Sequence, residues 1–198
     1  MQIGANDGRR FDPIYEFANS ARFDFSGLAV EPVPRFFRDL QRAYRNKPGI
    51  KLVNAAIHNT DSEATLYVVS EKYDSKVPEW ALGTASFNRD HVIKPEVPEE
   101  YVEAIQVPCI SLEDLMEQEG FHDIDLLQID TEGYDSEIVR NIDLEKIRPS
   151  MIHFEHGLGD GVMKQSEIDD LIQRFNGHGY QVLLENYDAL AFLPHRLG

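Results

Sequence analysis

The sequence has only one cysteine, Cys109, among its 198 residues. A single cysteine cannot form a disulfide within the chain, and this scarcity favours a reducing, cytoplasmic location. Cys109 lies in an apolar stretch, so we expect it to pack in the interior rather than to act as a nucleophile. No apolar run approaches the roughly 20 residues that cross a bilayer. We therefore expect neither membrane insertion nor a secretory signal peptide.

Positive charge is also scarce, since 19 Lys and Arg stand against 35 Asp and Glu, a formal net charge of −16. A field of this sign repels polyphosphate, which argues against a nucleic-acid substrate and against anionic membranes. Simple solubility explains the same acidity most economically. The length fits one domain of ordinary size. Because no repeat, low-complexity tract or linker interrupts the chain, we expect residues 1–198 to form a single domain.

The stretch Ile3 to Gly8, Ile-Gly-Ala-Asn-Asp-Gly, has the composition of a strand that turns into a ligand-binding loop. Glycine adopts positive φ and lets a ligand approach the backbone, while Asn and Asp accept hydrogen bonds in tight turns. Asp12-Pro13 then predicts the start of a helix. The stretch lacks the third glycine of the dinucleotide fingerprint and the Lys-Ser/Thr of a phosphate loop. Only three residues precede Gly4, so we expect a short, clipped first strand.

The next segments continue a strand–helix alternation. Residues 27–30 and 50–57 are apolar and strand-like, and a helix with one apolar face starts at Pro34 between them. This βαβαβ order predicts a parallel sheet with right-handed crossovers. Glu31 follows Gly8 by 31 − 8 = 23 residues, close to the spacing of about 20 at which an acidic residue ends the second strand and binds ribose hydroxyls.

Residues 70–100 are interrupted by prolines and give no clear periodicity. An irregular loop of this length is usually functional, and we interpret it as a mobile cover over the ligand. Its tryptophan, Trp80, has the chemistry to stack on a sugar, but we expect it to anchor the loop in a core.

The second half resumes the alternation with strands at 102–110, 124–130 and 151–156 and a final hairpin formed by 180–185 and 189–193. Helices are expected from Ser111 to Gly120, from Asp135 or Ser136, and from Ser166. Ligands bind outside the carboxyl ends of parallel strands. That rule groups residues 4–8, Glu31, residues 54–57, residues 130–133, and Glu155 with His156. Taken singly, Glu31 fits a helix cap, Asp130 and Asp135 fit turn acids, and His156 fits a hydrogen-bonded histidine equally well.

Several of these motifs together resemble the FkbM-type methyltransferase family over nearly the whole chain. The most specific are Glu31-Pro32 and the block Ile129-Asp130-Thr131-Glu132-Gly133, supported by residues 3–8, 56–57, 85–86 and 111–115. The resemblance implies a Rossmann-like class I fold, α/β with helices on both faces of a mostly parallel seven-stranded sheet that ends in an antiparallel hairpin. It also implies S-adenosylmethionine as cofactor and O-methylation of a small-molecule or saccharide hydroxyl.

The resemblance further implies roles for individual residues. Gly4, Asn6, Asp7 and Gly8 would line the methionine and ribose part of the cofactor, and Glu31 would hold the ribose diol. Pro32, next to Glu31, would belong to the same set of cofactor-binding residues. Ala56 and Ile57 would face the adenine, and Asp130 would lie near the amino-acid end. Gln2 stands where such enzymes often carry an acid, so we expect neutral hydrogen bonding to support the loop.

Methyl transfer to a hydroxyl also needs a proton acceptor. His156 is the leading candidate because histidine titrates near neutrality, with Glu132 and Glu155 in reserve. The same carboxylates have the chemistry to hold a divalent cation, which we favour less. Two alternatives stay open, a nicotinamide-dependent oxidoreductase that uses Glu31 on the adenosine ribose and a non-catalytic S-adenosylmethionine-binding module.

Overall fold

The computed structural model describes residues 1–198 except 11, 13, 21–24, 60, 61, 161, 197 and 198. It divides into two compact units, residues 2–110 and residues 111–198 together with Met1. The proline of the predicted Asp12-Pro13 helix start lies outside the described residues.

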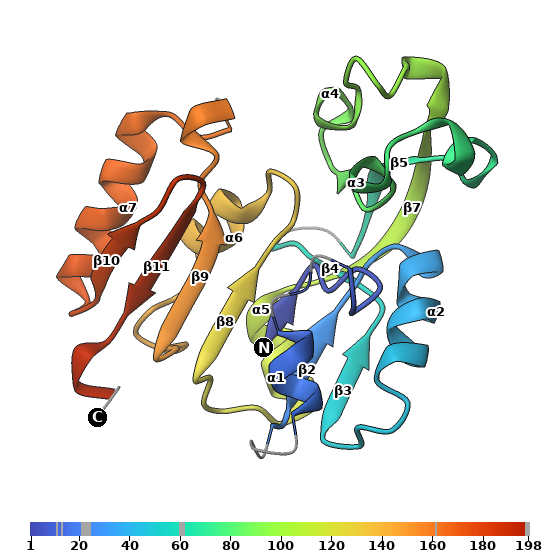
Figure 1. The fold of residues 1–198 in the computed structure, drawn as a ribbon. Coiled ribbons are helices and arrows are strands. Elements are labelled where there is room, and N and C mark those ends of the chain that lie inside the picture. The colour runs from blue at the N-terminus through green and yellow to red at the C-terminus, as the bar shows by residue number, and fades with distance from the viewer. Residues whose placement is uncertain (11, 13, 21–24, 60–61, 161, 197–198) are drawn as a thin grey trace. The chain divides into compact units, whose positions relative to one another are not determined.

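The N-terminal unit contains the predicted βαβαβ pattern (Figure 1). Its strands are parallel in the order β1-β2-β3, with Ile3 opposite Val30 and Val30 opposite Val53. The first strand has two residues, as short as expected. Helix α2 starts with a proline after an extended Val33, and its Phe36 and Leu40 are buried. The bounds are β1 (Gln2–Ile3), α1 (Tyr15–Asn19), β2 (Gly27–Val30), α2 (Pro34–Ala43) and β3 (Ile50–Val53).

The predicted strand 50–57 is wrong as one element, because the chain leaves the first sheet at Asn54. The Asn54 amide Nδ2 donates to the carbonyls of Glu31 and Pro32, at 2.8 and 3.0 Å. Ala56 and Ile57 therefore form β4 of a second sheet, ordered β4-β7-β5-β6. Strand β7 is parallel to β4 and antiparallel to β5. The remaining bounds are β5 (Glu63–Val69), β6 (Ala85–Ser86) and β7 (Val102–Ile110).

The segment between β5 and β7 is built of short regular elements rather than one irregular loop. Pro78 and Pro98 cap helices instead of only breaking them, since proline is tolerated where helices start. A small core of Val69, Ala81, Val92 and Val97 holds the segment together. Trp80 is 46% exposed, so its expected role as a core anchor is wrong. The elements are η1 (Glu71–Lys76), α3 (Glu79–Leu82), β6, α4 (Arg89–Val92) and η2 (Glu99–Tyr101).

The C-terminal unit has four strands in the order β10-β11-β9-β8. Strands β8 and β9 are parallel, whereas β11 is antiparallel to both β9 and β10. Helix α5 is capped as predicted by Ser111, whose side chain accepts from the Asp114 amide, and by Gly120, which has φ 70°. The bounds are α5 (Leu112–Glu119), β8 (Leu126–Ile129), α6 (Asp135–Asn141), β9 (Met151–Glu155), η3 (Leu158–Asp160), α7 (Gln165–Gly177), β10 (Gln181–Leu184), β11 (Asp188–Phe192) and η4 (Pro194–Arg196).

The described residues therefore contain the expected mixed α/β architecture, with parallel strands in both units and the expected antiparallel pair at the end of the C-terminal unit. Buried Leu127, Ile152 and Phe154 form the sheet side of the C-terminal core, and Ile168 and Phe175 contribute from α7, which lies along β10 (Figure 1). Within the described part of the chain, no helix is long and apolar enough to cross a membrane.

Candidate active site

The loop of residues 4–8 directly follows β1 and is set by three left-handed residues. Gly4, Asn6 and Gly8 have φ values of 80°, 49° and 67°. Asparagine tolerates this conformation better than most side chains, and here the Asn6 Oδ1 accepts from the Asp7 amide at 2.8 Å. Gly8 leaves no room for a side chain, because an added Cβ would lie 2.6 Å from the Leu40 Cδ1. The loop is thus packed tightly against helix α2.

Every backbone amide of this loop donates a hydrogen bond inside the protein. The Gly4 and Ala5 amides both donate to the Val30 carbonyl at 3.0 Å, and the Gly8 amide donates to the Ala5 carbonyl at 2.9 Å. The Asn6 amide donates to Glu31, and the Asp7 amide to Asn6. Because phosphate-binding loops direct free amides at their ligand, this loop differs from them in chemistry as well as in sequence.

Glu31 joins the ends of two strands to the start of α2. Its side chain is buried, with 4% of the residue exposed. The Oε2 atom accepts from the Asn6 amide and the Oε1 atom from the Val33 amide, both at 2.8 Å. Both oxygens of the carboxylate thus accept from backbone amides. The ribose contact of Glu31 and the cofactor contact of Pro32 stay predictions.

Asp7 closes the loop onto the residues that follow it. The Asp7 Oδ1 accepts from the Arg9 and Arg10 amides, both at 2.9 Å, and its Oδ2 pairs with the Arg10 guanidinium. Burial opposes ionisation, but the hydrogen bonds from Arg10 and Arg9 and the charge of Arg10 outweigh it and lower the pKa of Asp7. Asp7 is therefore held as a carboxylate under the loop.

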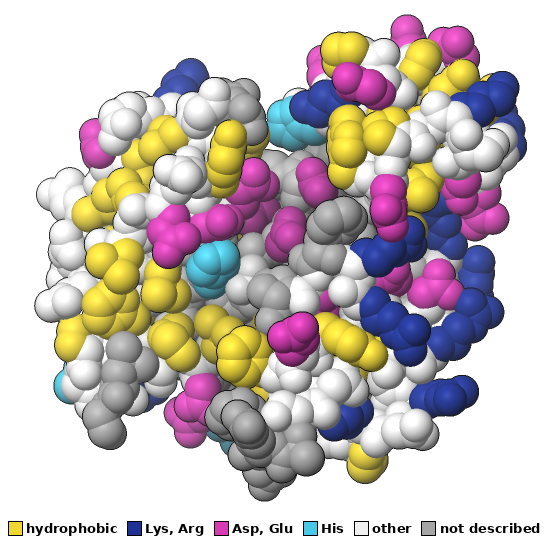
Figure 2. All heavy atoms as spheres, viewed as in Figure 1, with side chains coloured by type: hydrophobic (Ala, Val, Ile, Leu, Met, Phe, Trp, Pro, Cys, Tyr) yellow, Lys and Arg dark blue, Asp and Glu magenta, His cyan; other side chains and the backbone are white. Residues whose placement is uncertain are grey.

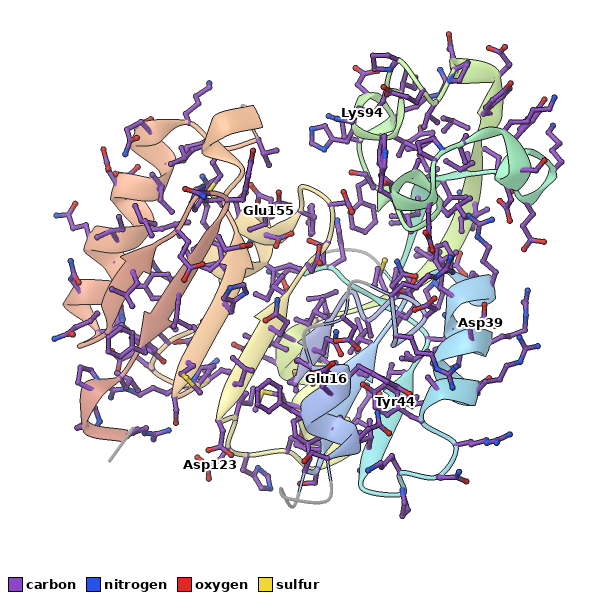
Figure 3. All side chains as sticks on the ribbon, in the orientation of Figure 1. Glu16, Asp39, Tyr44, Lys94, Asp123 and Glu155 are labelled. Atoms are coloured by element: carbon purple, nitrogen blue, oxygen red, sulfur yellow. The ribbon has the colours of Figure 1, made fainter. Side chains whose placement is uncertain are left out.

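Asp12 is the hydrogen-bond partner of the Gln2 side chain. The Gln2 Nε2 donates to the Asp12 Oδ1 at 3.0 Å, and the same oxygen accepts from the Ile14 amide at 2.8 Å. Tyr44, labelled in Figure 3 beside α2, donates to the Asp12 Oδ2 at 3.4 Å. Burial raises the pKa of Asp12. The Gln2 side chain is thus hydrogen-bonded to a carboxyl group that the sequence did not suggest, and the support of the loop by neutral hydrogen bonding stays a prediction.

The two residues expected at the adenine lie on the second sheet. Ala56 and Ile57 are 5% and 3% exposed. Ala56 packs in a cluster with Val33, Phe36 and Val107. The contact of Ala56 and Ile57 with the adenine of a cofactor stays a prediction.

In the C-terminal unit, the turn after β8 carries the Asp130–Gly133 block. Glu132 and Gly133 have φ values of 53° and 99°, and Asp130 and Glu132 are exposed. Asp135, which the sequence suggested only as a turn acid, fixes this turn. Its Oδ2 accepts from the Thr131 amide at 3.0 Å and from the Thr131 hydroxyl.

Asp135 also joins the turn to the end of β9. Its Oδ1 accepts from the Glu155 amide at 3.1 Å, and Glu155 marks the end of that strand in Figure 3. Asp135 is 1% exposed, and burial raises its pKa. One buried carboxyl group thus positions two of the predicted catalytic residues, Glu132 through its turn and Glu155 through its backbone. Sequence spacing alone gave no sign of the second contact.

His156 is enclosed by backbone groups. It is 2% exposed. Its Nδ1 accepts from the Leu158 amide at 3.1 Å, which makes the Nε2, 3.1 Å from the Glu185 carbonyl, the protonated nitrogen. In this conformation neither nitrogen is available to take a proton from a substrate. These contacts favour the alternative of a hydrogen-bonded structural histidine over the base role predicted from sequence.

Among the described residues, no three His, Cys, Asp or Glu side chains are grouped so that they could hold a metal ion. Cys109 is partly buried, and its Sγ lies 3.8 Å from the Val107 carbonyl. Both observations concern only the part of the chain that the structure describes.

Two comparisons with known proteins gave different results. A search of curated proteins returned no match, whereas a protein-family model matches most of the chain. Residues 2–182 match the model of the methyltransferase FkbM domain, and this match includes the glycine loop, Glu31, the Asp130–Gly133 block and Glu155. The chain therefore belongs to the FkbM methyltransferase family.

Proposed function

We propose that this chain is an S-adenosylmethionine-dependent O-methyltransferase with a class I, Rossmann-like fold. Its acceptor is a hydroxyl group on a sugar or another small molecule. Family membership supports methyl transfer. The observation that carries the choice of cofactor is the loop of residues 4–8, whose five amides all donate within the protein.

This hydrogen-bonding state separates the two nucleoside cofactors considered. A nicotinamide dinucleotide brings a pyrophosphate that needs backbone donors at the first strand–helix turn. The nucleoside part of S-adenosylmethionine carries no phosphate, and it suits a loop that offers close backbone approach and a buried carboxylate. Glu31 supplies that carboxylate at the carboxyl end of β2. The residues present therefore fit S-adenosylmethionine better than a dinucleotide.

Individual residues take the following parts in this proposal. Gly4, Asn6, Asp7 and Gly8 hold the methionine and ribose portion, and Glu31 accepts from the ribose hydroxyls through charge-assisted hydrogen bonds. Pro32, Ala56 and Ile57 border the base, and Asp130 attends the amino-acid end.

Methyl transfer of this kind does not require a covalent bond between the protein and the substrate. The bound cofactor supplies a methyl group activated by a sulfonium, and the protein has to hold a hydroxyl oxygen in line with it and exclude water. The hydroxyl proton needs an acceptor. Glu155, held by Asp135 through its amide, and Glu132 are the better candidates, because His156 has both nitrogens engaged. Carboxylates of this kind act as bases when their pKa is matched to the task.

Isothermal titration calorimetry with S-adenosylhomocysteine tests the cofactor assignment. We expect the wild-type chain to bind and Glu31→Ala to lose at least tenfold in affinity. Glu113→Ala, which removes an exposed carboxylate paired with Lys146 at the surface, should bind as the wild type does. No binding by the folded wild-type chain would refute the proposal.

Transfer of labelled methyl from S-adenosylmethionine to a panel of hydroxyl compounds tests the reaction. We expect at least one saccharide or small-molecule alcohol to be labelled, and Glu155→Gln to slow that labelling without weakening cofactor binding. Cofactor binding with no transfer to any acceptor would favour a non-catalytic binding module instead.

A further inference from the structure

The segment between β5 and β7 is attached to the glycine loop through one glycine, Gly83. Helix α3 of this segment ends at Gly83, which has φ −84° and ψ −15°. Any residue adopts these angles, so the backbone does not require glycine here. The neighbouring side chain of Asn6 is the reason that glycine is required at this position. A Cβ added at position 83 would lie 2.5 Å from the Nδ2 atom of Asn6.

Asn6 cannot move away from Gly83 without consequence for the loop. Its carboxamide is held on one side by Gly83 and on the other by the Asp7 amide, which donates to Oδ1 at 2.8 Å. Its own amide donates to Glu31. Rotating the carboxamide would relieve a clash with a side chain at position 83, but it would break the bond to Asp7. Gly83 thus restricts the orientation of the Asn6 side chain, which maintains the loop conformation. The two residues are 83 − 6 = 77 positions apart in the sequence.

Two arginines, Arg35 and Arg10, also contact this segment from the same part of the N-terminal unit. Arg35, at the start of α2 and with 13% of its side chain exposed, donates to the Leu82 carbonyl at 3.2 Å and pairs with Asp74 at 3.1 Å. Arg10 approaches Glu79 at 3.9 Å. Figure 2 shows Lys and Arg side chains gathered over α2. These basic residues draw the acidic segment onto the helix that follows Glu31.

We propose that Gly83 is a positioning residue for the cofactor loop, and that the segment of residues 70–101 sets cofactor affinity through its contact with Asn6. The inference rests on the proposed function, because it assigns S-adenosylmethionine to the loop of residues 4–8. It gives the segment a part in cofactor binding beyond that of a cover over the ligand.

A double-mutant cycle read by calorimetry with S-adenosylhomocysteine tests this coupling. Gly83→Ala should weaken binding about fivefold to tenfold, as expected when one hydrogen bond near the ligand is lost. Asn6→Gly removes the side chain that position 83 meets, and glycine suits the φ of 49° at Asn6. In that background, adding Gly83→Ala should change the affinity less than twofold.

Gly177→Ala is the matched control, because a Cβ at this glycine of α7 meets nothing within 4 Å; it should leave the affinity unchanged. Circular dichroism should show that Gly83→Ala folds, since rotation of one side chain relieves the clash. If the wild type binds and Gly83→Ala binds equally well, or loses the same factor with and without the Asn6 side chain, the inference is overturned while the proposed function stands. A wild-type chain that binds no S-adenosylhomocysteine would overturn both.

Discussion

Glu31→Gln is the substitution that most sharply tests how the loop is held. Glutamine keeps the length of the side chain but replaces one carboxylate oxygen with an NH₂ group. That group would face a backbone amide, either of Asn6 or of Val33, each of which now donates to Glu31 at 2.8 Å. A hydrogen bond to a charged acceptor contributes about 1.5–3 kcal/mol, and an unpaired buried amide costs about 1–3 kcal/mol.

We therefore expect Glu31→Gln to lower the free energy of unfolding by about 2–3 kcal/mol. For a chain of this size that corresponds to a fall in Tm of about 4–12 °C. Urea denaturation and thermal melts followed by circular dichroism measure both quantities. Glu113→Gln is the control, since an exposed pair such as Glu113 with Lys146 is worth about 0–1 kcal/mol. A loss for Glu31→Gln no larger than that of the control would refute the reasoning.

Four further predictions follow from buried contacts, each checked by denaturation. Gly8→Ala should lower the free energy of unfolding by about 2–4 kcal/mol, because the added Cβ would clash with Leu40 at a position of positive φ. Gly120→Ala is its control, because Gly120 has a similar φ of 70° but open space around it, so this substitution measures the cost of positive φ alone. Asp135→Asn should cost about 2–4 kcal/mol, because an amide oxygen replaces only part of its acceptors. His156→Phe should cost about 2–4 kcal/mol, whereas lost turnover with unchanged stability would show a catalytic base. Because the pKa of Asp12 is raised in the fold, its contribution to stability is present below the unfolded pKa of about 3.9 and is lost as pH rises through the folded value. Asp12→Asn should therefore become more favourable relative to the wild type between about pH 3 and pH 7, and a constant difference would contradict this.

Local patterns predicted the elements that short-range chemistry determines. The glycine loop, the acid after the second strand, the Ser111 cap and the final hairpin all occur where the sequence placed them. In each case the signal lies within a few residues of the feature, as a turn residue, a cap or an alternation of apolar side chains.

Contacts between residues far apart in the sequence escaped prediction. Asn54 ends β3 because its side chain finds the Glu31 and Pro32 carbonyls, and periodicity contains no trace of that. The prolines of residues 70–100 suggest an irregular cover loop, although Pro78 and Pro98 begin helices.

Side-chain roles in the candidate site depended on partners that no motif encodes. Histidine chemistry makes His156 the leading base in the sequence, but its two nitrogens are hydrogen-bonded to Leu158 and Glu185. Asp135, the carboxyl that joins the ends of β8 and β9, showed in the sequence only as a turn acid.

The central claim is that the loop of residues 4–8 receives a nucleoside cofactor without a pyrophosphate. Parallel calorimetric titrations of the wild-type chain with S-adenosylhomocysteine and with NADH test it most directly. The account predicts saturable one-to-one binding of S-adenosylhomocysteine and no measurable heat of binding for NADH. Binding of NADH in preference to S-adenosylhomocysteine would contradict it.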